Sequence, residues 1–489
     1  MKSIVFCNVG NRDIVVAGES QADSRAPARL RGKRLNENVK AYQEQISLPI
    51  ITPALSYLLE RHQEGTGTVV LIGTDQPDTH LNNQPDVYGV PFRDKDTIWY
   101  AHTAARWLKG QYNTKQVERF KAEQVQVNPS LYDEAMTAYG RLLQPYAETE
   151  VETCYVVAVG GTPACNTALL LQAVRLFGER CRTIYVPEGE RPYALQIGRQ
   201  IWEVMQENTA AAFLRRYDFA AADPLLAQRG VPTALQAINS YARLRLDFDF
   251  ETAQQSLQTA VNRGEGAVRE FARLIRGDLD QLLAGDDLAL IGELYQNARL
   301  CWQNGRYVDF LGRAFRLQEA IMRYLIADLY DGLNTDIKAA AAFVAYIDER
   351  SHLQAYMSAQ THEGQPVDYS KLNRIVFLAM IRHVVETGLA GDPQRTLPDE
   401  RRSQLKTIYG LLKRIEDLGD LRNKTIIAHG YRGVSEAIVQ QAYNKNSGAD
   451  RYDPLDDMAA VCGALGISAP NPFRSVAEFI IGQLQGEPA

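Results

Sequence analysis

The sequence has 489 residues, a formal net charge of −6, and 45% hydrophobic and 23% charged residues. These proportions are ordinary for a soluble globular protein, and the length corresponds to about two to four domains. The chain has no apolar run of the roughly 18 residues that a membrane-spanning helix needs, so we expect no membrane segment. The acidic balance argues against a protein that binds nucleic acid over its whole surface, but it is compatible with a local basic cleft.

The cysteines and histidines show no spacing typical of a metal site. The six cysteines form no CxxC pair, and none of the seven histidines has a second histidine three or four residues further on. Most cysteines lie in apolar segments, where cysteine behaves as a small hydrophobic residue. We therefore predict a cytoplasmic protein with no disulfide framework, no metal and no other cofactor.

The first 205 residues alternate between short apolar runs and segments with helical spacing. The apolar runs predict β-strands at residues 3–9, 68–73, 151–159 and 183–186. Helices are expected within residues 38–61, at 97–109 with Asp96 as N-cap, and at 165–177. Runs that are apolar throughout are typical of strands buried on both faces. The alternation therefore predicts a Rossmann-like domain with a mostly parallel, doubly wound sheet.

Strand signals end near residue 205, and amphipathic helices follow. The clearest helix spans residues 307–330, where apolar side chains recur at steps of three and four. We divide the chain into an N-terminal Rossmann-like domain (1–205), a helical connector (206–285) and a C-terminal all-helical domain (286–489). The predicted fold class is α/β followed by all-α.

Small polar residues follow three of the predicted strands, where open parallel sheets bind their ligands. The glycines after the third of these strands free backbone N–H groups, and the helix behind them offers its N-terminus to an anion. The alternative is a set of turns that need glycine only for their backbone angles. The candidate ligand-binding residues are Asn8, Gly10, Asn11, Arg12, Thr74, Gly160, Gly161, Thr162 and Asn166. No GxGxxG follows the first strand, and no GxSxG elbow or P-loop is present.

A second candidate site lies in the segment LRNKTIIAHGY, residues 421–431. On an α-helix, the seven-residue spacing of Arg422 and His429 places both on one side, with Gly430 as the helix stop and buried isoleucines between them. One such Arg–His spacing is also expected by chance, with an exposed arginine and a capping histidine as the alternative. Basic residues gather on the same C-terminal helices: Arg299, Arg306, Arg313, Arg316, Arg323, Arg401, Arg402, Lys406, Lys413, Arg414, Lys424 and Arg432. Their grouping in an acidic protein is consistent with a phosphate-bearing substrate.

The order of these features resembles a known family. A Rossmann-like domain with Gly160-Gly161-Thr162-Pro163 and Asn166 after a central strand precedes a helical domain with Arg422-Asn423 and His429. This arrangement is similar to that of the CRISPR-associated CARF–HEPN ribonucleases, the ancillary effectors of type III systems. The resemblance covers essentially the whole chain in architecture.

The resemblance implies a homodimer that binds a cyclic oligoadenylate activator across the two CARF domains. Cyclic tetra-adenylate is our expectation, with the hexa-adenylate open. The resemblance further implies a composite HEPN site that cleaves single-stranded RNA without a metal. His429 would act as general base or acid and Arg422, beside Asn423, would stabilise the charge of the transition state. Attack by the 2′-OH of the RNA would leave a 2′,3′-cyclic phosphate and a 5′-hydroxyl.

Two alternatives remain open at the level of sequence. The first is a nucleotide-sensing regulator whose helical domain binds a partner or nucleic acid without cleaving it. The second is a HEPN toxin ribonuclease whose N-terminal domain takes another ligand. A His429→Ala exchange separates the first alternative from a nuclease, and a screen of nucleotide ligands separates the second.

Overall fold

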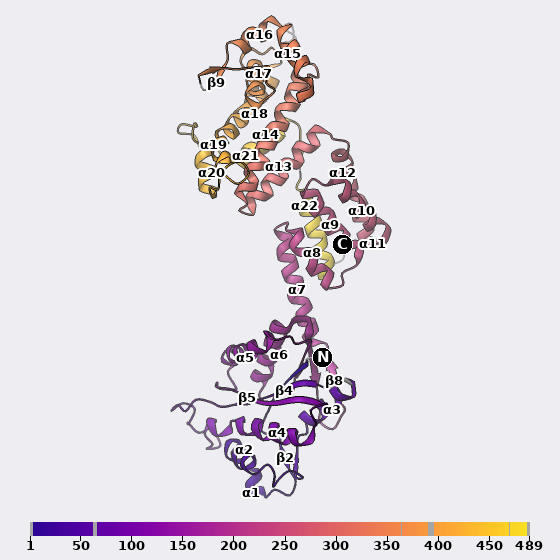
Figure 1. The fold of residues 1–489 in the computed structure, drawn as a ribbon, viewed down its shortest axis with the longest axis vertical. Helices are drawn as coiled ribbons and strands as arrows, with labels where there is room; N and C mark the ends of the chain where they lie inside the picture. Colours follow the sequence, from indigo (N-terminus) through magenta and orange to yellow (C-terminus); the bar gives the residue numbers. More distant parts are fainter. Residues whose placement is uncertain (1–2, 62–65, 363, 390–395, 469, 487–489) are drawn as a thin grey trace. The chain divides into compact units, whose positions relative to one another are not determined.

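The computed structural model describes residues 3–61, 66–362, 364–389, 396–468 and 470–486 (Figure 1). The chain divides into two compact units, Met1–Gln206 and Glu207–Ala489, which are described one at a time. Within the described residues, no helix combines the length and the apolar character needed to cross a membrane.

The first unit is built on a six-stranded sheet with the strand order β5-β4-β1-β6-β7-β8. The sheet is parallel except for β8, which pairs antiparallel with β7. Its strands are β1 (Ser3–Asn8), β4 (Thr66–Thr74), β5 (Val117–Val125), β6 (Thr153–Val157), β7 (Cys181–Tyr185) and β8 (Tyr193–Leu195), beside the small pair β2 (Val15–Val16) and β3 (Ile46–Ser47). Its helices are α1 (Gln21–Ser24), α2 (Ala28–Glu37), α3 (Ile51–Arg61), α4 (Ile98–Gln111), α5 (Tyr132–Ala147) and α6 (Pro163–Phe177), with 3-10 turns η1 (Phe92–Lys95) and η2 (Gly178–Arg180). Helix α7 (Ile197–Arg215) contains the point at which the two units divide.

The central strands are apolar throughout because each of their faces is covered by helices. In β1, Val5 and Cys7 belong to a core shared with α2, α3 and α4, whereas Ile4 and Phe6 belong to a core shared with α5 and α6. The strands β4 and β6 alternate in the same way. This two-sided burial confirms the predicted doubly wound sheet, and it explains why the predicted strands at 3–9, 68–73, 151–159 and 183–186 are found, with small shifts of their ends.

Two local predictions differ from the structure. Asp96 does not cap α4, because its carboxylate instead accepts hydrogen bonds from the backbone N (2.7 Å) and Nε2 (3.1 Å) of Gln76. Thr97 occupies the N-cap position without a side-chain cap. The edge strand β5 and the helix α5 were not predicted, since the strand sequence VERFKAEQV carries charged residues at alternate positions and lacks a continuous apolar run.

The second unit is helical apart from one short hairpin, β9 (Thr361–His362) with β10 (Gln365–Pro366). Its helices are α8 (Phe219–Gln228), α9 (Thr233–Leu246), α10 (Phe250–Arg263), α11 (Gly266–Leu274), α12 (Arg276–Leu283), α13 (Asp287–Gln303), α14 (Tyr307–Leu329), α15 (Ala340–Asp348), α16 (Ser351–Ser358), α17 (Arg374–Thr387), α18 (Asp399–Asp417), α19 (Gly419–Asn423), α20 (Glu436–Tyr443), α21 (Pro454–Ala464) and α22 (Pro472–Gln485), with the 3-10 turn η3 (Ile337–Ala339). The predicted amphipathic helix at 307–330 is α14, which buries its apolar stripe in the larger core of this unit.

Two apolar cores hold the second unit together. The larger core joins helices α13 to α21. The smaller core joins α8, α9, α10 and α12 with the last helix of the chain, α22, which lies beside α9 (Figure 1). A buried ion pair links the two regions, because Arg245 on α9 donates to both carboxylate oxygens of Glu293 on α13, at 2.8 and 2.7 Å.

Candidate functional site

A cavity of about 520 Å³ lies at the carboxyl ends of the strands in the first unit, and we call it the strand-end cavity. Its position is the switch point of the sheet, where the chain leaves β1 for β4 on one side and later reaches β6 on the other. Seven of the nine predicted ligand-binding residues line it: Gly10, Asn11, Arg12, Thr74, Gly160, Gly161 and Thr162. Their role in ligand binding stays a prediction.

The glycines of this cavity are required by close approach of the backbone. Gly160 and Gly161 have φ angles of 94° and 68°, in the region that favours glycine. A Cβ on Gly160 would lie 2.3 Å from the carbonyl oxygen of Asn8, and one on Gly10 would lie 2.7 Å from the backbone N of Gly161. The two loops therefore touch through bare backbone, and this close approach shapes one wall of the cavity.

Asn8 and Asn166 do not line the strand-end cavity, and their side chains form hydrogen bonds within the protein. Asn8 is 1% exposed. Its Nδ2 donates to Asn166 Oδ1 at 2.8 Å, and its Oδ1 accepts from the hydroxyl of Tyr139 at 2.5 Å. The network ties β1 to α5 and α6, so we expect Asn8 and Asn166 to position the glycine loop and not to touch a ligand.

The N-terminus of α6 opens next to the same loops. Thr162 is its N-cap, since Oγ1 accepts from the backbone N of Cys165 at 3.3 Å, and Pro163 takes the first helical position. The Thr162 hydroxyl also donates to the carbonyl of Pro129. Its hydrogen atom is thus engaged within the protein, which limits Thr162 to a capping role in this state.

Charges of both signs surround the strand-end cavity. Burial raises the pKa of Asp13, and the hydrogen bond that the Gly10 backbone N donates to it (2.6 Å) opposes this rise. Burial also raises the pKa of Asp96, and the hydrogen bonds from Gln76 oppose this rise. Arg12 is exposed and has no ion-pair partner in the described part of the chain. Its guanidinium is available to an anionic ligand.

The sequence reasoning missed the third wall of this cavity. Asn128, Pro129 and Ser130, in the loop after β5, line it together with Lys95 and Phe92 from η1. The signal that could have found this wall is an Asn-Pro-Ser turn cluster directly after a strand, but it points to the cavity only once β5 is recognised as a strand.

The Arg422 segment does not form the predicted helix. The helix α19 ends at Asn423, and residues 424–429 form turns that lead to His429. Ile426, expected to be buried, is 72% exposed, whereas Thr425 is fully buried. The helical-face argument for Arg422 and His429 is therefore wrong, because Arg422 lies in α19 and His429 lies in the loop that follows it.

The local sequence explains why the helix stops early. Thr425, Ile426 and Ile427 are β-branched, and the Thr425 hydroxyl donates to the carbonyl of Arg422 at 2.7 Å, which competes with a helical hydrogen bond. The chain then closes on itself, because the carbonyl of Lys424 accepts from the backbone N of Arg432 at 2.8 Å.

Gly430 makes this closed loop possible. A Cβ at Gly430 would lie 2.2 Å from the carbonyl oxygen of Lys424, so no larger residue fits without moving the backbone. Gly430, which was predicted to end a helix, thus allows the two ends of this loop to approach each other. His429 and Asn423, which this loop presents, are both exposed.

Arg422 lines a cavity of about 350 Å³ that we call the Arg422 cavity. Its other lining residues are Gly312, Phe315, Arg316, Glu319, Arg374 and Ile427. The guanidinium carbons of Arg422 and Arg374 each lie 5.1 Å from the ring centroid of Phe315, within cation–π range. In the described residues Arg422 has no carboxylate partner, whereas Arg374 pairs with Glu416 at 3.4 Å. His429 is not among the residues that line this cavity.

Much of the predicted basic cluster is engaged in structure. Arg401 pairs with Asp328 at 2.6 Å, Arg414 pairs with Asp457 at 2.6 Å, and Arg402 donates to the backbone carbonyls of Val385 and Glu386. Arg306, Arg316 and Arg323 also have carboxylate partners. Arg313 has none in the described part of the chain, and its Nε donates to Asn297 at 2.6 Å.

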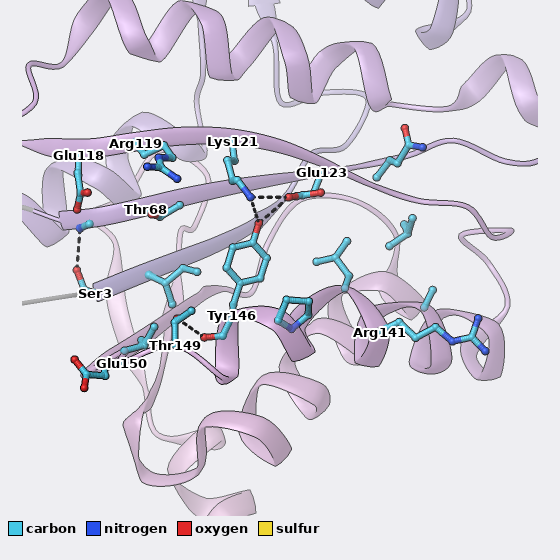
Figure 2. A pocket seen from close by; sticks show the side chains of 18 of the residues that line it. Ser3, Thr68, Glu118, Arg119, Lys121, Glu123, Arg141, Tyr146, Thr149 and Glu150 are labelled. Atoms are coloured by element: carbon cyan, nitrogen blue, oxygen red, sulfur yellow. Dashed lines mark hydrogen bonds and ion pairs between the residues drawn. The ribbon is translucent and has the colours of Figure 1, made fainter.

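A cavity of about 1020 Å³, larger than the strand-end cavity, lies elsewhere in the first unit, as a groove between β5 and α5 (Figure 2). At its centre the Tyr146 hydroxyl donates to Glu123 at 2.7 Å, and Lys121 lies within reach of both groups, at 3.2 and 3.3 Å. Burial and Glu123 together raise the pKa of Tyr146. Lys121 and Glu123 are thus paired within the groove.

No group of three or more His, Cys, Asp or Glu side chains with metal-binding geometry is found among the described residues. The six cysteines are buried and free.

Comparison with known proteins identifies a related fold. No family model matches the sequence, and no curated protein matches it either. Among solved structures, the chain is similar to Enterococcus italicus Csm6 bound to cyclic hexa-2′-fluoro-hexa-dAMP, with a TM-score of 0.50 and 15% sequence identity over 99% of this chain and 100% of that one. At this identity the likeness is one of fold. The chain therefore has a Csm6-like fold, in which a Rossmann-like N-terminal region with a mostly parallel sheet precedes a mostly helical region.

Proposed function

We propose that this protein is a cyclic-oligoadenylate-activated, metal-independent endoribonuclease of type III CRISPR defence that cleaves single-stranded RNA. The observation that carries the proposal is the full-length likeness to a Csm6 bound to a cyclic oligonucleotide analogue. The strand-end cavity and the Arg422 cavity then have distinct tasks, sensing in residues 1–205 and cleavage in residues 286–489, with residues 206–285 as the connector.

The strand-end cavity supports binding of a phosphodiester ring. Its bare glycine loops let the backbone approach a ligand, and Arg12 and the N-terminus of α6 favour an anion. We propose a homodimer in which two copies of the cavity share one symmetric ring, since a two-fold ligand suits a two-fold site. We keep cyclic tetra-adenylate as the expected activator and test the hexa-adenylate beside it.

The Arg422 loop supports cleavage by the RNA's own 2′-OH. In the proposed step a base removes the 2′-OH proton, the 2′-oxygen bonds to phosphorus, and the 5′-oxygen leaves with a proton from an acid. We assign these proton transfers to the exposed His429, from either copy of a dimer. Arg422, held over Phe315 without a carboxylate partner, would bind the charge on the phosphoryl oxygens, with Asn423 beside it.

The proposal is tested with a fluorogenic RNA in EDTA, with and without cyclic tetra- or hexa-adenylate. We expect cleavage only with an activator, loss of cleavage in His429→Ala, and full cleavage in His362→Ala, a control that removes another exposed histidine of the same unit. Activator-dependent RNA binding without cleavage in the wild type would support a sensing regulator instead. Cleavage that no cyclic oligoadenylate changes would support a HEPN toxin with another ligand.

A further inference from the structure

A second arginine-rich cavity lies between the connector helices and α13–α14, and we call it the Arg243 cavity. Its volume is about 350 Å³. Its charged lining residues are Arg216, Arg243, Arg306, Arg313, Asp218 and Asp247, so that positive charges exceed negative ones. All of these residues belong to the second unit.

The guanidinium groups of this cavity are only partly neutralised. Arg306 pairs with Asp309 at 2.6 Å, but Arg216 and Arg243 have no carboxylate partner in the described part of the chain. The Nε of Arg243 is buried and has no hydrogen-bond partner there. A buried donor without a partner is unfavourable, so it marks a place where an acceptor from a ligand would be bound.

The Arg243 cavity continues toward the Arg422 cavity along α14. A third cavity of about 500 Å³ lies between them and is lined by Arg313, Arg316 and Arg323. It shares Arg313 with the Arg243 cavity, and it shares Gly312 and Arg316 with the Arg422 cavity. The three cavities are therefore adjacent along α14, and we call them together the α14 track. Arginines line each of the three, and Glu319 and Asp287 also line the track.

Gly312 lies where the third cavity meets the Arg422 cavity. A glycine inside a helix is less favourable than an alanine at the same position. The backbone does not require it here, because a Cβ would meet only the Cδ1 of Ile427, at 4.0 Å. Because Gly312 has no side chain, α14 leaves room at this point for a bound strand to pass from one cavity to the next.

We propose that this track binds the phosphate backbone of the RNA substrate, with a phosphate distant from the scissile bond held by Arg216 and Arg243. The inference rests on the proposed function, since it extends the substrate site of the nuclease. A strand, and not a small anion, is favoured because each of the three adjoining cavities contains an arginine without a carboxylate partner in the described residues: Arg216, Arg243 and Arg313 in the Arg243 cavity, Arg313 in the third cavity and Arg422 in the Arg422 cavity. Tyr217 lines the Arg243 cavity beside the two arginines and offers a ring on which a base can stack.

The test uses the full-length protein with activator in a His429→Ala background, so that RNA is bound and not cut. Binding of an RNA of about 12 nucleotides and of a dinucleotide is measured by fluorescence anisotropy at several salt concentrations. Arg216→Glu and Arg243→Gln are compared with Arg263→Glu, an exposed arginine of α10 that lies outside the three cavities.

We expect Arg216→Glu and Arg243→Gln to raise Kd for the long RNA about tenfold, which corresponds to removal of one charge-assisted hydrogen bond. The slope of log K against log salt should fall by about 0.7 for each phosphate that the variant no longer neutralises. The dinucleotide should lose less affinity than the long RNA, and Arg263→Glu should change neither.

Equal affinities in all three variants would overturn the inference and leave the nuclease proposal intact, as wild-type cleavage would show. Weaker binding of ATP or inorganic phosphate, with unchanged RNA binding, would identify a small-anion site and would also overturn it. Absence of both RNA binding and wild-type cleavage would instead refute the proposed function, and the track with it.

Discussion

The buried pair between Arg245 and Glu293 allows a quantitative test of how α9 is held to α13. The side chains are 5% and 3% exposed, and Arg245 also donates to the Tyr241 hydroxyl at 2.6 Å. Burial alone lowers the pKa of Arg245, but the hydrogen bonds and charge of Glu293 outweigh it and raise the pKa overall. Because an arginine guanidinium is not deprotonated in proteins, we expect Arg245 to stay charged when Glu293 is removed.

Glu293→Gln is expected to destabilise the second unit by about 3–5 kcal/mol, because it leaves a buried charge uncompensated. The double variant Arg245→Met with Glu293→Leu should recover most of this loss, since it removes both charges. Hydrogen exchange of α9 and α13, followed by mass spectrometry, measures the effect. The expected loss corresponds to exchange that is faster by about two orders of magnitude or more.

A matched control is the exposed pair Arg474–Glu478 on α22, whose side chains are 70% and 63% exposed. Glu478→Gln should leave exchange in α9 and α13 unchanged, because exposed pairs contribute little. If Glu293→Gln behaved like this control, the argument that a buried lone charge drives the loss would be refuted.

Three further predictions concern single residues. Burial and His352 lower the pKa of His383 to about 4, so the folded state disfavours the proton that the unfolded state binds near pH 6.5. The free energy of unfolding should therefore fall by up to about 3 kcal/mol as the pH drops from 6.5 to 4. Urea titrations of His383→Gln should show a free energy of unfolding that depends less on pH over this range. Gly160→Ala should weaken activator binding measured by calorimetry, whereas Gly189→Ala, with φ of 73° and open space around its Cβ, should not. Gly430→Ala should abolish RNA cleavage while circular dichroism stays unchanged, and cleavage at the wild-type rate would show that the closed loop is dispensable.

The sequence predicts the central sheet well because burial on both faces leaves a strong signal. The central residues of β1, β4 and β6 alternate between two cores, so each strand contains a continuous run of apolar residues that is not typical of a surface element. The edge strand β5 escapes the same reasoning, since Arg119, Lys121 and Glu123 face the groove beside α5. An edge strand with one covered face buries only part of its residues, so its sequence lacks the continuous apolar run that marks a central strand.

The candidate sites were found from residue type more reliably than from geometry. Loop composition was enough to gather seven residues around the strand-end cavity, because parallel strands bring their carboxyl ends to one edge. The spacing of Arg422 and His429 led to a helix that the structure does not contain, since the Thr425 hydroxyl bonds to the backbone and the loop closes through Gly430. Helical periodicity does not reveal that a side chain competes for the hydrogen bonds of the helix backbone.

The place of α22 has a consequence for the synthesis of the chain. Phe473, Ile480 and other apolar residues of α22 complete a core whose remaining members lie between residues 210 and 300. Helices α14 to α21 therefore lie, in the sequence, between two segments of one core, and that core lacks a wall until α22 has been synthesised. Domains tend to fold in the order of their synthesis, but this core needs a helix that is made long after its other members, so it is expected to close last although most of it is made early. A nascent or truncated chain without α22 would leave this core open.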